Sequence, residues 1–384
     1  MFESPPKPTS PLAYHRILSP SAAVKVSPLC LGGISIGESW SGHFGKNEDA
    51  FTLLDTFFEL GGNFIDTSNV YNSGESETLI GDWMQKHDTR DQMVIATKYS
   101  AGYMGHMREQ KPMQANYTGN SAKSMYVSVR DSLAKLKTEY IDILYVHWWD
   151  FGTSVEEVMR HLHTLVMARQ VLYLGVSDTP AWIVVKANAF ARQHGLTPFS
   201  VYQGKWHAGM RDMEAELIPM CEDEGLAVVP WAALGQGQLL TEEQRKERAN
   251  DPDARRGYHG NEQTIKISAA CEEIAKLKNT SLQAVQALAY LFGQSAYVFP
   301  IVGVQTVEHV KAMPDALRIT LTPEEIAKIQ DAAPFDPLFP MSFLYNYDGK
   351  QRYTTKLTPA HNKQYQMAAW INAPPKQGGF DPII

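Results

Sequence analysis

The feature that most constrains the fold is an apolar strand that ends abruptly in chemically functional side chains. The stretch from Gly61 to Tyr71 reads G-G-N-F-I-D-T-S-N-V-Y, so that the carboxylate of Asp66 directly follows an apolar pair. Residues 48–60, just upstream, carry apolar side chains at nearly helical spacing, and a glycine pair ends that helix. The pattern predicts a helix, then a buried strand whose carboxyl end presents Asp66 and Tyr71.

Two later apolar runs end in the same way. Residues 93–97 read M-V-I-A-T and are followed by Lys98, and residues 141–146 read I-D-I-L-Y-V and are followed by His147. In a (β/α) barrel the carboxyl ends of the strands form one face, and that face is where such folds carry out chemistry. We therefore expect the carboxylate, phenol, ammonium and imidazole to share one site.

Strand and helix patterns alternate along most of the chain, which favours a parallel sheet. The strand candidates are residues 26–33, 63–66, 93–98, 141–147, 171–177, 199–203, 226–231 and 297–302. The clearest helical patterns between them are residues 122–136, 155–169, 182–194 and 213–224. Eight such units predict an α/β protein, a (β/α)8 TIM barrel with long βα loops and a C-terminal tail.

Composition excludes several classes of function. The net charge of the 384 residues is −7 without a long basic run, which argues against nucleic-acid partners and anionic membranes. Apolar runs stay short of the ~18 residues that a membrane helix needs. The three cysteines are widely separated and there is no export signal, which predicts a cytoplasmic protein. The sequence also lacks H-E-x-x-H and paired C-x-x-C spacing, so we expect no metal site.

The quoted motifs can be compared with known families. G-x-N-F-x-D-T-S-x-x-Y, followed by A-T-K and Y-V-H, resembles the aldo-keto reductase superfamily over residues 29–333. Within it, the chain is most similar to the fungal aryl-alcohol dehydrogenase and norsolorinic-acid-reductase-like group. The catalytic tetrad that this resemblance implies is Asp66, Tyr71, Lys98 and His147. Each residue also has a structural explanation, such as helix capping, rim packing, a surface charge or a buried histidine.

The chemistry of carbonyl reduction gives each member of this tetrad a role. An oxygen that accepts negative charge during hydride transfer must be stabilised and then protonated. Tyr71 is the expected acid, and the Lys98 ammonium is expected to lower its pKa from about 10. Asp66 would orient that ammonium, while His147 would hydrogen-bond the substrate oxygen or relay the proton.

The same resemblance implies a nicotinamide cofactor, NADP(H) rather than NAD(H). Ser177 and Asp178 stand in a G-V-S-D context where the family usually has G-V-S-N, so the amide donor is missing. Gln203 would face the carboxamide, Trp231 would stack on the ring, and Gln305 with His309 would meet the 2′-phosphate without an arginine or lysine. The full set is Gly33, Asp66, Ser177, Asp178, Gln203, Trp231, Ala232, Leu234, Gly235, Gln236, Gly237, Gly303, Gln305 and His309.

Aromatic residues near the predicted strand ends indicate a flat, apolar substrate, although each could serve packing alone. They are Trp40, Tyr99, Trp148 and Trp149. The expected activity is NADPH-dependent reduction of aromatic aldehydes or ketones, reversible as alcohol oxidation. The alternatives are a reductase dedicated to a polyketide-like aromatic ketone, or a cofactor-binding regulatory subunit like the potassium-channel β-subunits. A monomer and a homodimer are both compatible with the sequence.

Outside the strands and helices, three parts of the chain are expected to serve separate purposes. Residues 1–12 are rich in proline and serine and are expected to be a disordered tail, before a barrel domain over 13–334. The resemblance implies a hairpin over residues 14–26 and a C-terminal extension, 335–384, that borders the substrate site. The loop 99–119 is long enough to serve function, and the charged segment 241–260 either covers the cofactor or is solvated surface.

Overall fold

The computed structural model describes residues 4–45, 47–250, 261–282, 288–345, 353–376 and 378–379. The chain divides into two compact units. The first comprises Met1–Gly204, Glu224–Val229 and Ile301–Pro314, and the second comprises Lys205–Asp223, Pro230–Pro300 and Asp315–Ile384.

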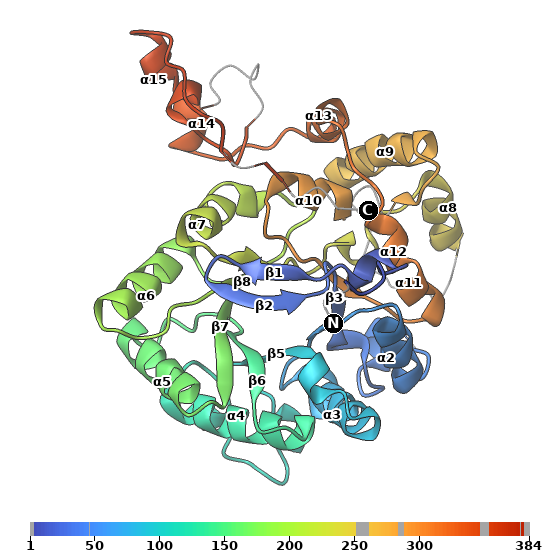
Figure 1. Ribbon diagram of the computed structural model, residues 1–384, viewed down its shortest axis with the longest axis vertical. Coiled ribbons are helices and arrows are strands. Elements are labelled where there is room, and N and C mark those ends of the chain that lie inside the picture. The colour runs from blue at the N-terminus through green and yellow to red at the C-terminus, as the bar shows by residue number, and fades with distance from the viewer. Residues whose placement is uncertain are drawn as a thin grey trace. The chain divides into compact units, whose positions relative to one another are not determined.

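The first unit is built on a sheet of eight parallel strands (Figure 1). They are β3 Cys30–Gly32, β4 Phe64–Asp66, β5 Val94–Tyr99, β6 Ile141–Val146, β7 Val171–Ser177, β8 Val201–Gln203, β9 Ala227–Val228 and β10 Ile301–Gly303. Their order in the sheet is β10-β3-β4-β5-β6-β7-β8-β9, so that consecutive strands are neighbours from β3 to β9, and β10 pairs with β3. The prediction of a (β/α)8 fold is confirmed.

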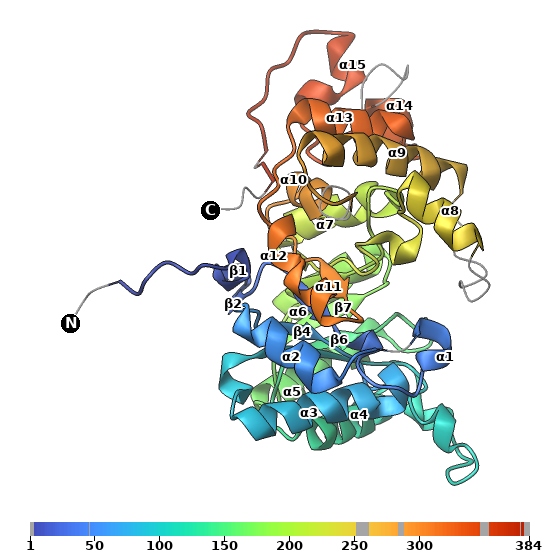
Figure 2. The ribbon, with the colours of Figure 1, turned by 90° about the vertical axis from the view of Figure 1, so that its right-hand side faces the viewer.

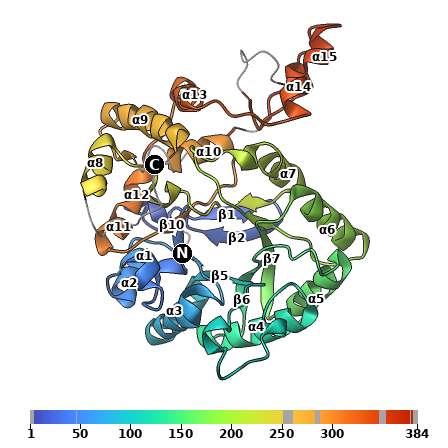
Figure 3. The ribbon, with the colours of Figure 1, turned by 180° about the vertical axis from the view of Figure 1, so that it is seen from behind.

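Helices of the first unit alternate with these strands and surround the sheet, as Figures 1 and 3 show from opposite sides. They are α1 Ser41–Phe44, α2 Ala50–Glu59, α3 Glu75–His87, α4 Ala122–Leu136, α5 Val155–Met167, α6 Ala181–Gln193 and α11 Val307–Lys311. Side chains of Asp49, Ser121 and Ser154 accept hydrogen bonds at the amino ends of α2, α4 and α5. The expected hairpin is also present, as β1 Arg16–Ser19 and β2 Ala22–Val26.

The first barrel strand is shorter than predicted because side chains take over its backbone hydrogen bonds. The amide of Ser27 donates to Asn63 Oδ1 at 2.7 Å, and Ser27 Oγ donates to the carbonyl oxygen of Leu29 at 2.8 Å. Pro28 has no backbone N–H to offer. The predicted strand over 26–33 therefore pairs only as Cys30–Gly32, and Val26 belongs to the hairpin.

The sheet is curved, but its two edge strands do not pair with each other in the described part of the chain. Among the described residues, no backbone ladder joins β9 to β10. Both strands are bounded by proline, because Pro230 follows Val229 and Pro300 precedes Ile301 in the chain. Proline cannot donate to a ladder, which shortens the strands predicted over 226–231 and 297–302.

The second unit is mainly helical. Helix α13 (Pro323–Ala332) packs against α9 (Glu262–Leu277), as Figure 2 shows. Lys278 Nζ lies 3.1 Å from Glu325 Oε2. The other helices of this unit are α8 Glu242–Asn250, α10 Tyr290–Gln294, α14 Met341–Tyr345 and α15 Lys363–Gln366, while α7 Leu217–Glu224 and α12 Met313–Ala316 cross the unit boundaries. The charged segment predicted over 241–260 thus begins as a helix, and residues 251–260 lie outside the described chain.

A buried charged network ties the C-terminal tail to the rest of the second unit. Both carboxylate oxygens of Glu214 are occupied, since Arg211 Nη2 donates to Oε2 at 2.7 Å and Tyr290 Oη donates to Oε1 at 2.9 Å. The Arg211 guanidinium lies 5.1 Å from the ring centroid of Phe335, and Tyr353 Oη donates to the carbonyl oxygen of Ala215 at 3.1 Å. Two points of the predicted tail are therefore anchored within this unit.

Nothing in the described ranges resembles a membrane span. The helices there lack the combination of length and apolar character that crossing a bilayer requires.

Candidate active site

The predicted tetrad comes together at the carboxyl ends of three adjacent strands. Asp66 is the last residue of β4, Lys98 lies near the end of β5, and His147 directly follows β6. Parallel pairing aligns Asp66 with Ala96 and Lys98 with Tyr145, which brings these ends to one edge of the sheet. Tyr71 opens a tight 3-10 turn, Tyr71–Gly74, just after β4.

The ammonium of Lys98 is the centre of this arrangement. Its Nζ donates to Asp66 Oδ1 at 2.5 Å, to the carbonyl oxygen of Thr67 at 2.7 Å and to Tyr71 Oη at 3.3 Å. An ammonium group has three protons, so these contacts satisfy all of them. Lys98 is fully buried, and its charge is therefore held in place by the carboxylate and directed at the phenol.

Burial and charge set the protonation state of the tetrad. Burial lowers the pKa of Lys98, but the Asp66 carboxylate and the Tyr71 hydroxyl outweigh it and raise that pKa overall. Burial raises the pKa of Tyr71, and Lys98 offsets only part of this effect. The expectation that Lys98 lowers the pKa of Tyr71 is thus right for the direction of its own influence and wrong for the net shift. At neutral pH the phenol keeps its proton.

His147 is a neutral imidazole in this environment. Burial, followed by the nearby Lys98 charge, lowers its pKa well below the usual 6.5. The ring lies edge-on to Tyr71, with centroids 5.9 Å apart and an interplanar angle of 76°. Nδ1 of His147 is 3.3 Å from Ser68 Oγ, a contact between positions 79 residues apart that has no local signal in the sequence. A neutral ring can donate one hydrogen bond and cannot act as a strong acid.

Gln203 reaches the tetrad directly. The family resemblance implies that this residue faces the nicotinamide carboxamide. It lies at the end of β8, and its Nε2 donates to Asp66 Oδ2 at 2.8 Å. Because Lys98 binds Oδ1, both oxygens of the Asp66 carboxylate are occupied. This second support for Asp66 comes from a position 137 residues away in the chain and has no local sequence signal.

Residues predicted at the nicotinamide end of the cofactor also lie at strand ends of the first unit. Ser177 ends β7 with its Oγ buried and without a hydrogen-bond partner, as expected for a hydroxyl that awaits a polar ligand group. Asp178 adopts a left-handed backbone (φ 41°), which asparagine and aspartate tolerate best, and its amide donates to the carbonyl oxygen of Gln203 at 3.0 Å. The residues present fit a carboxamide.

Gly33 has a packing requirement as well as the predicted role beside a ligand. A Cβ at this position would meet the carbonyl oxygen of Asp66 at 2.8 Å and Ser76 Oγ at 3.0 Å. The carbonyl oxygen of Gly33 itself accepts from Ser76 Oγ at 2.8 Å. Glycine is therefore needed for β3 to approach the end of β4 that carries the carboxylate.

The turn predicted to meet a 2′-phosphate has mixed electrostatics. His309 is exposed, and its Nδ1 accepts from the Gln305 amide at 3.3 Å, while Gly303 is exposed at the end of β10. The carboxylate of Glu48 accepts from the Val307 amide at 2.9 Å in the same turn. A carboxylate works against binding of a second anion, so the predicted preference for NADP(H) meets an opposing charge here.

In the second unit, the glycine turn predicted for the pyrophosphate has a left-handed backbone and a cation beside it. Gly235, Gln236 and Gly237 have φ values of 69°, 52° and 78°. Arg248, from α8, donates from Nη1 to the carbonyl oxygen of Gly237 at 2.6 Å. On the same helix, Nη1 of Arg245 is buried without a hydrogen-bond partner. Both arginines lie within the charged segment predicted over residues 241–260.

The predicted cofactor residues just before this glycine turn also have contacts within the second unit. Trp231 is half-buried, with Lys205 Nζ 5.6 Å from its ring centroid, and Ala232 has a left-handed backbone (φ 55°). Leu234 directly precedes the glycine turn. Stacking of Trp231 on a nicotinamide ring stays a prediction.

Two of the four predicted substrate residues border the tetrad. The ring of Trp40 lies 6.3 Å from that of Tyr71, and the ring of Trp148 lies 4.7 Å from that of His147. Trp148 is 40% exposed and so is open to a ligand. Tyr99 and Trp149 are buried, and the Tyr99 hydroxyl donates to the carbonyl oxygen of Asn120 at 3.4 Å. Their contact with a substrate stays a prediction.

The loop that carries Trp40 is held in place by two side chains. Glu75 Oε2 accepts from the amides of Glu38 and Ser39 at 2.9 and 3.0 Å. Asn72 Oδ1 accepts from the Trp40 amide at 2.8 Å. Since Asn72 follows Tyr71 directly, the turn that positions the phenol also positions the aromatic wall beside it.

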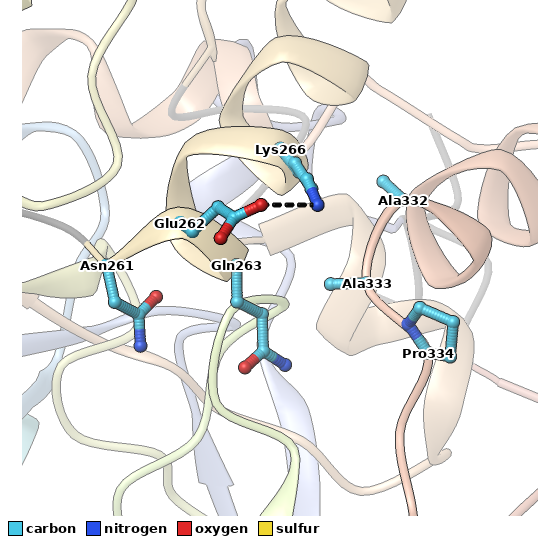
Figure 4. A pocket seen from close by; sticks show the side chains of 7 residues that line it. All are labelled: Asn261, Glu262, Gln263, Lys266, Ala332, Ala333 and Pro334. Carbon is cyan, nitrogen blue, oxygen red and sulfur yellow. Dashed lines mark ion pairs between the residues drawn. The ribbon is translucent and has the colours of Figure 1, made fainter.

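A hollow lined by both polar and apolar residues lies at the start of α9 in the second unit, as Figure 4 shows. Its lining residues are Asn261, Glu262, Gln263, Lys266, Ala332, Ala333 and Pro334. Glu262 and Lys266 pair with each other at 2.8 Å, and the lining includes none of the predicted site residues. Within the described ranges, no cluster of histidine, cysteine, aspartate and glutamate suited to a metal ion occurs.

Comparison with known proteins places this geometry in a family. Residues 28–334 match the aldo/keto reductase family. Norsolorinic acid reductase A of Aspergillus parasiticus is 47% identical over 98% of this chain and 96% of its own length. A putative aryl-alcohol dehydrogenase of Saccharomyces cerevisiae is 46% identical (96% and 98% covered), and an aryl-alcohol dehydrogenase [NADP(+)] of Phanerodontia chrysosporium is 47% identical (87% and 90% covered).

Family, fold and site chemistry agree with one another. The match covers the whole eight-stranded sheet and every member of the tetrad. The chain belongs to the aldo/keto reductase family, and it is an oxidoreductase that acts on carbonyl or alcohol groups of small molecules with a nicotinamide cofactor.

Proposed function

We propose that this enzyme reduces aldehydes or ketones, chiefly aromatic ones, with NADPH, and that it oxidises the corresponding alcohols in the reverse direction. The observation that carries the proposal is the Lys98 ammonium, which contacts both Asp66 and the Tyr71 hydroxyl. The exposed indole of Trp148 and the nearby Trp40 support an aromatic substrate. A relative named for NADP(+) supports the choice of cofactor.

The side chains have distinct tasks in the proposed reaction. A nicotinamide bound beside the tetrad would supply the hydride for the carbonyl carbon. Tyr71 donates its proton to the carbonyl oxygen as negative charge develops there, and Lys98 stabilises the phenolate that results. Asp66 holds the ammonium in position, with Gln203 supporting the carboxylate from its other side. Neutral His147 donates a hydrogen bond to the same carbonyl oxygen.

The residues proposed to bind the cofactor are considered for each unit by itself. In the first unit, the unpartnered hydroxyl of Ser177 would donate to the carboxamide oxygen, and Asp178 would accept from its amide. Gln305 and His309 are the residues proposed for the adenosine phosphate. In the second unit, Trp231 is proposed for the ring, and the backbone of Gly235–Gly237 with Arg248 is proposed for the pyrophosphate.

The test measures turnover of a panel of benzaldehydes with NADPH, monitored by the absorbance of the reduced cofactor. The same measurements with NADH provide the comparison. The proposal expects aldehyde-dependent oxidation that is much faster with NADPH. Equal rates with NADH would show that Gln305 and His309 do not bind the phosphate. The comparison is informative because the Glu48 carboxylate contacts the same turn and opposes the binding of a phosphate there. NADPH binding without turnover of any carbonyl would favour a regulatory subunit.

The relatives named norsolorinic acid reductase favour a second candidate, a reductase dedicated to one large aromatic ketone. Including norsolorinic acid in the same panel separates the two. A kcat/KM for that ketone far above the values for all benzaldehydes would support the dedicated reductase.

The two reaction directions are expected to differ in pH dependence. Reduction requires protonated Tyr71, whose pKa burial raises above its ordinary value near 10, so this requirement is met below that value and is lost only as pH rises beyond it. His147 stays neutral because its pKa lies well below 6.5. We expect kcat for reduction to be flat between about pH 7 and 9, while alcohol oxidation, which needs the phenolate, rises with pH. A reduction profile with an inflection near 6.5 that His147→Gln abolishes would contradict this.

Arg248 offers a test of the phosphate site. Replacing it with methionine removes a cation from the glycine turn and is expected to raise the Kd for NADPH by about 10-fold, as for loss of one charge-assisted hydrogen bond. Titration of protein fluorescence with NADPH measures this. Lys246→Met removes the same charge from an exposed position of the same helix, paired with Glu242, and should leave Kd nearly unchanged. Equal effects of the two changes would show a non-specific role of charge.

A further inference from the structure

Among the residues that the structure describes, Ser68 is the one whose side chain lies within hydrogen-bond distance of a His147 ring nitrogen. Ser68 is fully buried, two residues beyond the strand β4, and its Oγ lies 3.3 Å from Nδ1 of His147. The two residues are 79 positions apart and come from the ends of different strands. A buried contact of this kind can decide where a neutral imidazole carries its proton.

The location of that proton matters because the two tautomers do opposite things. With the proton on Nε2, the ring can donate a hydrogen bond to a carbonyl oxygen. With the proton on Nδ1, the ring would present the Nε2 lone pair to that oxygen, and two acceptors repel each other. Burial keeps the pKa of His147 low, so the ring is not doubly protonated at neutral pH and must adopt one of these two tautomers.

The surroundings of Ser68 favour one direction for the hydrogen bond. The amide of Val70 approaches Ser68 Oγ at 3.5 Å, which is also at the limit of a hydrogen bond, and it does so on the acceptor side of the hydroxyl. The hydroxyl proton then has two possible acceptors, Nδ1 of His147 at 3.3 Å and Oδ1 of Asn69 at 3.5 Å. The imidazole nitrogen is the nearer of the two, and the distance to Asn69 is at the limit of a hydrogen bond.

We propose that Ser68 donates its hydroxyl proton to Nδ1 of His147 and thereby fixes the ring as the Nε2–H tautomer. Ser68 is then a positioning residue, because it acts on the substrate only through the imidazole. The statement about the tautomer concerns the protein itself, whereas its consequence for turnover rests on the proposed reductase function. The relation is the same as that of a second residue that orients a catalytic histidine in other enzymes.

The direct test is the tautomer in the free protein. In a sample labelled with 15N at histidine, the chemical shifts of the two ring nitrogens report which one carries the proton. The chain has 12 histidines, so a His147→Gln sample assigns the signals. We expect Nε2–H for wild-type protein and for Ser68→Thr, which keeps the hydroxyl, and a mixture of tautomers for Ser68→Ala. Nδ1–H in the wild-type protein overturns the proposal, even if a variant fails to fold.

Turnover provides the second readout. Ser68→Ala is expected to lower kcat for carbonyl reduction by about 10- to 100-fold, a part of the range for a positioned acid–base group, while the Kd for NADPH stays the same. Ser68→Thr should recover most of that loss. A wild-type Nε2–H signal that Ser68→Ala leaves unchanged, together with unchanged kcat, also overturns the proposal. If wild-type protein turns over no carbonyl, the proposed function fails, and the NMR result still decides the role of Ser68.

Discussion

Replacing Tyr71 with phenylalanine is expected to reduce kcat for carbonyl reduction by about 10²- to 10⁴-fold, the usual contribution of a general acid. The change removes the only atom proposed to deliver the proton. It leaves the ring in its edge-on contacts with Trp40 and His147, and the Lys98 ammonium keeps Asp66 and the Thr67 carbonyl as partners. Fold and NADPH affinity should therefore be preserved, as measured by thermal unfolding and by fluorescence titration.

A matched control distinguishes loss of the acid from loss of a tyrosine hydroxyl in general. Tyr140 Oη donates to Asp91 Oδ1 at 2.8 Å on an exposed part of the first unit. Tyr140→Phe deletes the same atom and should leave kcat within about twofold, because a surface hydrogen bond contributes little. Undiminished turnover of Tyr71→Phe would rule out the acid role and return the imidazole to consideration as the proton source.

The part of this site that the sequence predicts is the part encoded locally. Asp66, Lys98 and His147 each follow an apolar run that is long enough for a buried strand, and parallel neighbours bring such positions to one edge. The helices could be predicted well where a capping residue marks the start. Helix α4 begins after Ser121 and spans Ala122–Leu136, the range that its periodicity predicts.

The remainder depends on where side chains point once strands are paired. Gln203 reaches Asp66 across 137 positions, and Ser68 reaches His147 across 79, so no local spacing signals either contact. The pKa of Tyr71 is another example. The charge of Lys98 is visible in the sequence, but the depth of burial that outweighs it is a tertiary property. Strand ends at Ser27 and Pro230 were likewise decided by individual hydrogen bonds and missing donors.

Removing the ammonium of Lys98 is expected to be the most damaging single change to stability at this site. In Lys98→Met, the Asp66 carboxylate stays buried, and among the described residues the Gln203 amide is its one remaining side-chain donor. Breaking one side of a buried ion pair costs about 3–5 kcal/mol, because an uncompensated charge remains in a poorly solvated place. We expect the free energy of unfolding in urea to fall by that amount, and kcat to fall at least as far as in Tyr71→Phe. Lys137→Met, which breaks an exposed pair with Asp82, should cost no more than about 1 kcal/mol.

A double variant separates the two roles of the pair. Asp66→Asn with Lys98→Met removes both charges, and asparagine still offers an oxygen to the Gln203 amide. Much of the stability lost in Lys98→Met should then return, since a buried ion pair is often no better than its neutral replacement. Activity should not return, because the cation that stabilises the phenolate is still missing. A double variant as unstable as the sum of its single changes would show that the pair stabilises the fold in its own right. Recovery of stability without recovery of kcat would instead show that the buried pair serves catalysis and does not itself stabilise the fold.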